Sequence, residues 1–181
     1  QRQSSFMLKL LRSAAAVVAP WGAQMDKNTK QVMFSSKTGN WATPQEFFDK
    51  LSWRFGPFDL DPCASTHNTK CANFFTKSEN GLEKDWEGFT CFVNPPYGRG
   101  IDKWIEKGYN EAMKNDTKVV MLIPARTDTK YWHKYVMKAS EIHFVKGRLK
   151  FGDSKNSAPF PSAVVVFDGG DELWRVEGIN K

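Results

Sequence analysis

The segment at residues 118–123 restricts the fold more than any other part of the sequence. It contains five consecutive apolar residues, VVMLI, and an apolar run without alternation is typical of a strand buried on both faces of a parallel sheet. The segment before it, residues 101–113, repeats apolar residues at the spacing of an amphipathic helix. A helix that leads into a fully buried strand predicts an α/β protein.

Other segments extend this pattern in both directions. Thr43 and Pro44 are typical of a helix start, with Thr43 as the cap, and the helix should run to about Arg54 and stop at Gly56-Pro57. Strands then alternate with helices and close in a hairpin, which predicts a mostly parallel sheet with an antiparallel C-terminal edge. The remaining predicted elements are strands at residues 58–60, 90–93, 141–145, 147–151 and 163–167, and a helix at 131–137.

The length and composition fit one domain. The chain has 181 residues, of which 40% are hydrophobic, and this is enough for a single buried core. The first 24 residues differ from the rest, because they contain basic residues, a small apolar run and no acid. Transit peptides and upstream extensions outside a fold share this composition. We expect an extension over residues 1–24 and one domain over residues 25–181.

The formal net charge of +6 is unevenly distributed. The first 24 residues contribute +3 of it through Arg2, Lys9 and Arg12. The remaining modest charge suits a protein that binds phosphates on one face, and it suits equally an enzyme for small acidic substrates. Charge alone therefore does not separate these classes.

The cysteines favour a reducing compartment. Cys63, Cys71 and Cys91 are odd in number and lack the paired spacing of a small secreted scaffold, so we expect free thiols. Cys63, His67 and Cys71 form a C-x3-H-x3-C pattern. Structural zinc sites usually have tighter cysteine pairs and need a fourth ligand, so we expect no metal here.

The motif Asn94-Pro95-Pro96-Tyr97 directly follows the predicted strand at residues 90–93. Loops at the carboxyl ends of strands hold ligands in open α/β sheets. The prolines remove backbone donors and leave rigid acceptors, so the Asn94 amide oxygen and the Pro95 carbonyl could accept both hydrogens of an aromatic amine. Such bonds keep the amine lone pair available to an electrophile, and Tyr97 could stack on a base swung out of a duplex. The alternative is a proline turn with a buried tyrosine.

With the segments around it, this motif resembles the phage-type DNA N6-adenine methyltransferases, the Dam-like family. The resemblance implies a Rossmann-like sheet and an enzyme that transfers a methyl group from S-adenosyl-L-methionine to adenine N6 in double-stranded DNA. It implies no metal and no membrane, and a phage or prophage protein in the cytoplasm of a bacterial host. It covers residues 32–168 and rests on residues 35–37, 41–44, 58–64, 80–82, Trp86, 94–98, 124–129, 147–149 and 159–162.

The resemblance also implies where the donor's methionine end binds. Trp41, Thr43 and Pro44 belong to a segment that looks like the helix-opening motif of related methyltransferases, which meets that end of the donor. A helix N-terminus favours a carboxylate there.

Two further segments complete the donor contacts that the resemblance implies. Asp61, followed by Pro62 and Cys63, looks like the first-strand motif, in which an acid accepts from the donor's ammonium group. Asn80 stands where many relatives carry an acid for the donor's adenine amino group. Its amide oxygen can still accept one hydrogen bond.

Cationic side chains near the motif are candidates for DNA contacts. Arg99, Arg126 and Arg148 could each meet a phosphate, and Arg126 could also meet a base edge. Asp128 could instead pair with Arg126 or cap the next helix. Trp104 lies at helical spacing among apolar residues, so we expect it in the core.

Two other functions are compatible with the residues. A methyltransferase acting on RNA adenine or on a protein amide would also present a planar amine to the motif. A non-catalytic DNA-binding relic is the second alternative, because Asn80 replaces the usual acid and no acidic strand end for the donor's ribose lies between Ala64 and Asn80.

Overall fold

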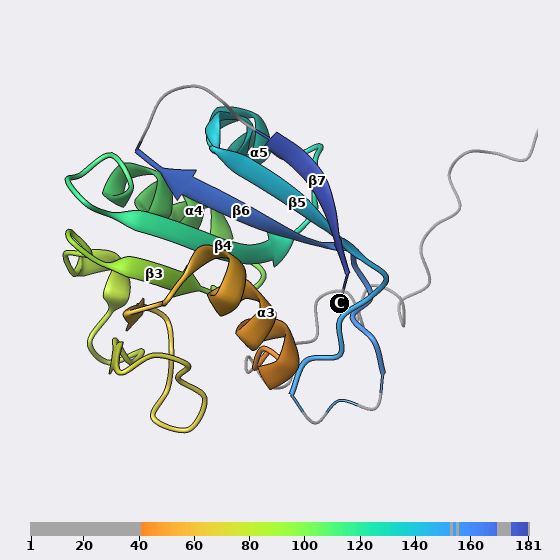
Figure 1. Ribbon diagram of the computed structural model, residues 1–181, viewed down its shortest axis with the longest axis horizontal. Coiled ribbons are helices and arrows are strands. Elements are labelled where there is room, and N and C mark those ends of the chain that lie inside the picture. The colour runs from red at the N-terminus through yellow and green to blue at the C-terminus, as the bar shows by residue number, and fades with distance from the viewer. Residues whose placement is uncertain (1–40, 153, 155, 170–174, 181) are drawn as a thin grey trace, which may run out of the picture.

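The computed structural model describes residues 41–152, 154, 156–169 and 175–180 (Figure 1). The predicted extension, the domain start at residue 25 and the segment 35–37 lie outside the described residues. The described chain forms one sheet in the order β2-β1-β3-β4-β6-β5-β7. Helix α3 (Gln45–Phe55) covers one face of the sheet, whereas α4 (Ile101–Glu111) and α5 (Lys130–Lys134) cover the other.

The sheet is mostly parallel, as predicted. One strand, β6, runs antiparallel to both of its neighbours, β4 and β5, and all other neighbouring pairs are parallel. The antiparallel strand therefore lies inside the sheet, and the edge strand β7 runs parallel to β5. The strands are β1 (Leu60–Asp61), β2 (Asn73–Phe74), β3 (Thr90–Val93), β4 (Lys118–Pro124), β5 (Glu141–Lys146), β6 (Ser162–Asp168) and β7 (Arg175–Asn180).

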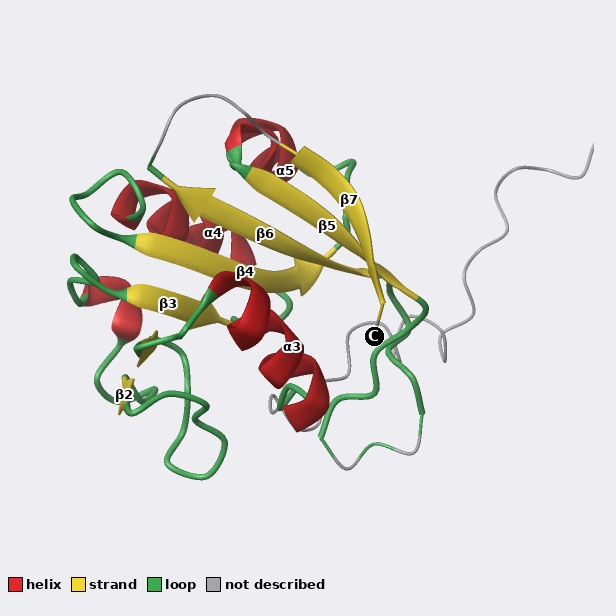
Figure 2. Ribbon diagram, viewed as in Figure 1, coloured by secondary structure: helices red, strands yellow, loops and turns green. Residues whose placement is uncertain are grey.

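The predicted strand at residues 147–151 is wrong, because this segment is a loop (Figure 2). Its alternating apolar residues, Leu149 and Phe151, are buried under α3 rather than in the sheet. Its backbone bonds also go to other loops, since Leu149 accepts from Ala158 and Gly152 donates to Ala42. The strand that pairs with β5 in the antiparallel direction is β6, so the predicted hairpin has a longer connection.

The core explains the unbroken apolar run of β4. Alternate residues of a strand point to opposite faces: Val119 and Met121 pack toward α4 and α5, whereas Val120 and Leu122 pack toward α3. Both faces of β4 are covered, so no β4 position from 119 to 124 is exposed.

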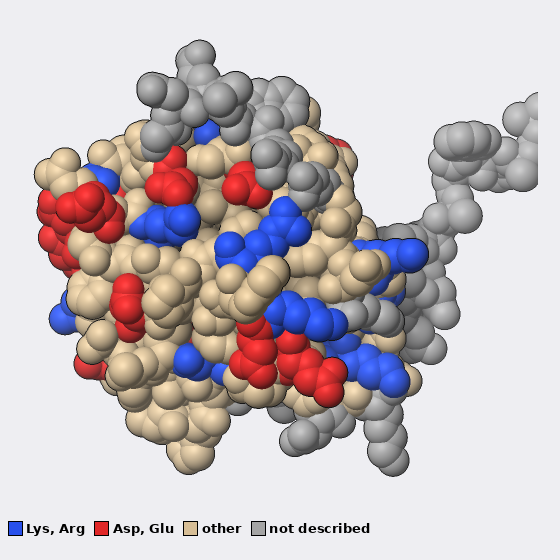
Figure 3. Space-filling model, viewed as in Figure 1, with Lys and Arg blue, Asp and Glu red and all other residues tan. Residues whose placement is uncertain are grey.

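The surface over α3 carries both signs of charge. Lys and Arg side chains are interspersed with Asp and Glu on this face (Figure 3). Among the described residues, no helix is long and apolar enough to cross a membrane.

Candidate active site

A cavity of about 440 Å³ lies at the carboxyl ends of β1 and β3. It brings together residues that are far apart in the sequence, from Trp41 to Trp104. Seven of the predicted site residues line it: Trp41, Pro62, Cys63, Asn80, Asn94, Pro95 and Pro96. Sequence reasoning did not identify five further residues in its wall: Ser65, Asn68, Thr76, Lys77 and Trp104.

The Asn94 side chain has a defined orientation at the end of β3. Its Nδ2 donates to the carbonyl oxygen of Trp41 at 2.6 Å and to Oγ1 of Thr43 at 3.0 Å. Its Oδ1 is buried and has no hydrogen-bond partner in the described part of the chain. The Trp41 carbonyl can only accept, so the amide nitrogen must face it and the oxygen must face away. Asn94 therefore presents a free acceptor.

Thr43 serves Asn94 rather than α3, which corrects the predicted cap. The cap position of α3 is Pro44, and no side chain caps the helix. Pro44 still starts the helix through its carbonyl, which accepts from Phe47 and Phe48. The hydroxyl of Thr43 is buried against Asn94.

Cys63 lies between the first strand and the motif. The backbone N–H of Asn94 donates to its sulfur, but burial has the larger effect and raises the pKa of the Cys63 thiol well above its usual value. Cys63 is therefore a neutral thiol in the cavity wall.

Tyr97 packs inside an aromatic group. Its ring stacks on Trp41 with centroids 6.1 Å apart and meets Phe151 and Phe160 edge-on. Its hydroxyl donates to the carbonyl of Leu122 at 3.3 Å, and burial raises its pKa well above the usual value. The phenol is thus fixed and neutral.

Asp61 is buried beside the main cavity. Its carboxylate lines a small pocket that also contains Thr43 and Asn94. Burial raises the pKa of Asp61 to about 6, although backbone N–H groups of Cys63 and Lys70 and the charge of Lys70 oppose the shift. A cationic group in this pocket would favour the ionised carboxylate.

The far wall of the cavity is a turn held by two tryptophans. Asn80 has a left-handed backbone, and a Cβ on Gly81 would lie 1.9 Å from the Pro62 carbonyl oxygen. Trp86 donates from Nε1 to the Gly81 carbonyl at 2.9 Å and stacks on Trp104 with centroids 6.3 Å apart. Trp104 is only half-buried and lines the cavity, so its predicted place in the core is only partly correct.

The cationic candidates are divided between two places. Arg99 and Arg126 line a second cavity of about 320 Å³ together with Tyr97. Arg148 lies exposed in the loop after β5, and the structure places it in neither cavity. Asp128 is exposed and forms no ion pair with Arg126 within the described residues, and the cap position of α5 is Thr129.

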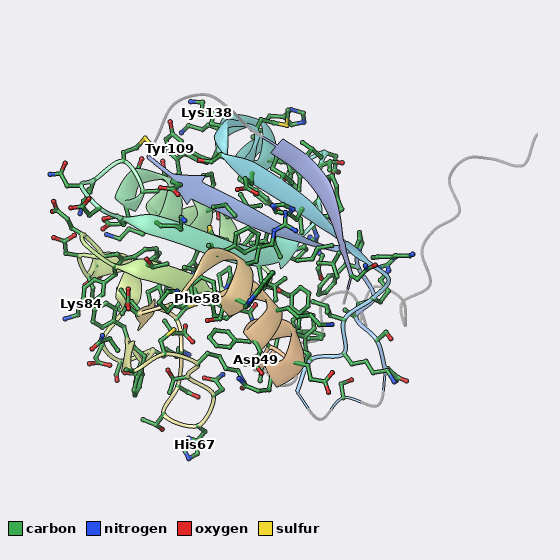
Figure 4. The ribbon with its side chains drawn as sticks, viewed as in Figure 1. Asp49, Phe58, His67, Lys84, Tyr109 and Lys138 are labelled. Carbon is green, nitrogen blue, oxygen red and sulfur yellow. The ribbon has the colours of Figure 1, made fainter. Side chains whose placement is uncertain are left out.

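The C-x3-H-x3-C residues do not converge. His67 is exposed and lies at the tip of its loop, away from the sheet (Figure 4). In the part of the chain that the structure describes, no group of three or more His, Cys, Asp or Glu side chains could hold a metal ion.

The sheet order, its single antiparallel strand and the cavity beside the Asn-Pro-Pro-Tyr loop define the class of Rossmann-like methyltransferases. Residues 28–167 match the family described as DNA N-6-adenine-methyltransferase (Dam). The chain belongs to this family and is an adenine-specific DNA methyltransferase.

Two phage proteins illustrate the relationship. The DNA N-6-adenine-methyltransferase of Haemophilus phage HP1 is 33% identical over 147 residues, which cover 77% of this chain and 84% of the relative. The DNA N-6-adenine-methyltransferase of Escherichia phage T1 is 31% identical over 142 residues, which cover 78% of this chain and 58% of the relative.

Proposed function

We propose that the protein transfers a methyl group from S-adenosyl-L-methionine to N6 of a flipped-out adenine in double-stranded DNA, with the amine held at Asn94. The observation that carries this proposal is the buried Oδ1 of Asn94, which has no partner while Nδ2 has two. A buried acceptor without a hydrogen bond costs about 1–3 kcal/mol. An N–H from the adenine amine would remove that cost.

The Pro95 carbonyl is the proposed second acceptor. Pro95 is buried, and its carbonyl accepts no hydrogen bond from the described part of the chain. With both N6 hydrogens accepted, the nitrogen lone pair stays available and the positive charge that develops on N6 is stabilised. The new N–C bond would form as the bond between the methyl carbon and the sulfonium sulfur breaks, and S-adenosylhomocysteine would leave. The positively charged N6 would then release one proton to solvent water, so no strong base is required before the attack.

The cavity of about 440 Å³ is the proposed donor site. Its volume lies within the range of roughly 300–1,000 Å³ for small-molecule sites. When bound, the donor supplies an electrophilic methyl carbon on a sulfonium. We propose that Asp61 and the α3 N-terminus hold the ammonium and carboxylate of its methionine end. Asn80 is the proposed acceptor, and Trp104 the proposed ring face, for its adenine. The proposed donor contacts are Trp41, Thr43, Pro44, Asp61, Pro62, Cys63, Asn80 and Trp104.

The DNA side of the site is proposed to begin at Tyr97. Tyr97 is one of the residues that line the second cavity, and its ring is the proposed stacking surface for the flipped base. Arg99, Arg126 and Arg148 are the proposed phosphate contacts. Because the HP1 and T1 relatives are phage proteins, we infer that the enzyme acts on DNA inside a bacterial host.

The test is incubation of the full chain with unmethylated duplex DNA and S-adenosyl-L-methionine, followed by mass spectrometry of the nucleoside digest. We expect N6-methyladenine, and we expect Asn94→Ala to lower turnover by about 10²-fold or more, because an acceptor aimed at the developing charge is removed. Asn110→Ala, an exposed asparagine on α4, is the matched control and should keep full activity.

Donor binding to both variants, measured by calorimetry, separates chemistry from binding. Turnover by Asn94→Ala at the wild-type rate would rule out its role as the amine acceptor. Methyl transfer into RNA or protein but not into DNA would show a different amine substrate, and a folded wild type that binds no donor would indicate a relic.

A further inference from the structure

The second cavity is separate from the proposed donor cavity. It has about 320 Å³ and shares no lining residue with the larger one. The loops after β3 and β4 and the starts of α4 and α5 form its wall. Tyr97 and Gly98 line this cavity, whereas Pro95 and Pro96 line the donor cavity. The Asn-Pro-Pro-Tyr motif is thus the partition between two binding spaces.

The second cavity has an excess of positive charge. Arg99, Arg126 and Lys130 line it, and Asp102 is the acid in its wall. Within the described part of the chain, none of the three cations forms an ion pair. In contrast, four described lysines on other surfaces do reach an acid within 4.0 Å, namely Lys107, Lys114, Lys118 and Lys134. The cavity therefore favours an anionic ligand.

The Tyr131 hydroxyl belongs to the same wall, beside the hydroxyl of Thr129. The oxygen of Tyr131 is buried and makes no hydrogen bond in the described part of the chain. The hydroxyl of Thr129 donates to the Arg126 carbonyl at 2.7 Å. Burial raises the pKa of Tyr131, although the Thr129 side chain and the charge of Arg126 oppose the shift, so the phenol keeps its proton and can donate to an incoming acceptor. A phenylalanine would fill this position without an unmet polar group, so the hydroxyl indicates a ligand.

We propose that this cavity binds a backbone phosphate next to the flipped adenine, through Arg126, Lys130 and the hydroxyl of Tyr131. This inference rests on the proposed function, because the adenine must reach Asn94 from the same loop. A guanidinium, an ammonium and a phenol together match the acceptor oxygens of a phosphodiester. The base of the same nucleotide would contact Tyr97 at the border of the cavity. One nucleotide would thus span the cavity, with its phosphate at the cations and its base at Tyr97.

The experiment measures binding of the full chain to duplex DNA at several salt concentrations. Each phosphate contact of a cation contributes about 0.9 to the slope of log K against log salt. We expect Arg126→Gln and Lys130→Gln each to reduce the slope by about 0.9 and to weaken binding about tenfold at about 0.1 M salt. Tyr131→Phe should weaken binding about fivefold with an unchanged slope, because a neutral donor releases no counterion.

Matched controls have the same chemistry elsewhere. Lys84→Gln removes an exposed charge that does not line the cavity and lies near the start of β3 (Figure 4), and Tyr109→Phe removes a hydroxyl from α4. Both should bind DNA as the wild type does. Wild-type affinity and slope in both Arg126→Gln and Tyr131→Phe would overturn the phosphate site while the proposed methyl transfer stands. A wild type that binds the donor but neither binds nor methylates DNA would overturn both.

Discussion

Asp61 combines a buried carboxylate with a role proposed at the donor site. Burial raises its pKa from 3.8 to about 6, so the folded protein holds a proton that the unfolded chain releases between about pH 4 and pH 6. The stability from this proton is fully present below the unfolded pKa and is lost as pH rises through 6. A difference of this size corresponds to about 3 kcal/mol.

Asp61→Asn tests this linkage. The variant should lose less stability than the wild type between pH 4 and pH 7, because asparagine has no proton to release. The free energy of unfolding, measured in urea at several pH values, gives the comparison. Asp59→Asn, which changes an exposed carboxylate two residues away, is the matched control. Parallel pH profiles for the wild type and Asp61→Asn would show that folding does not change the pKa of Asp61, and would contradict the linkage.

At the scale of elements, the turn at Asn80-Gly81 fixes the wall of the donor cavity. Gly81→Ala would place a methyl group 1.9 Å from the Pro62 carbonyl oxygen, and neither backbone can move cheaply. We expect a loss of about 1–3 kcal/mol in the free energy of unfolding, together with weaker donor binding. Thermal unfolding and calorimetry measure both effects.

The matched substitution for that turn is Gly178→Ala on β7, where an added Cβ meets nothing within 4 Å. It should leave donor binding unchanged and stability nearly so. Equal effects of the two substitutions would mean that the turn has relaxed away from Pro62.

Long or fully buried helices and strands could be predicted from the sequence. A two-residue strand and a buried loop could not. The apolar spacing in the sequence predicted β3, β4 and α4 well, because the spacing of apolar residues in these elements follows the faces that they bury. It missed β2, whose two residues are not fully buried. It also predicted a strand at residues 147–151, because the apolar loop residues buried under α3 alternate in the sequence as they would in a strand. Trp104 was misjudged for a related reason, since helical spacing cannot show that one ring face borders a cavity.

At the scale of the whole molecule, the donor cavity joins parts of the chain that the fold must hold in place together. A ligand that binds only this folded arrangement stabilises it by about 2.7 kcal/mol at a hundredfold excess over Kd. At about 2–4 °C per kcal/mol for a chain of this size, we expect S-adenosyl-L-methionine to raise Tm by about 5–10 °C. Methionine alone should raise it much less. An unchanged Tm at a high donor concentration would show that the folded protein does not bind the donor, and would contradict the proposed donor site.

The position of β6 has a consequence for how the protein is made. This strand lies between β4 and β5 inside the sheet, yet it begins only at Ser162. While the ribosome is still adding the segment between β5 and β6, β4 and β5 have no strand between them, and their backbone groups remain open to wrong partners. The nascent chain therefore cannot assemble its central sheet until β6 has emerged, and chaperones would have to protect the incomplete sheet until then.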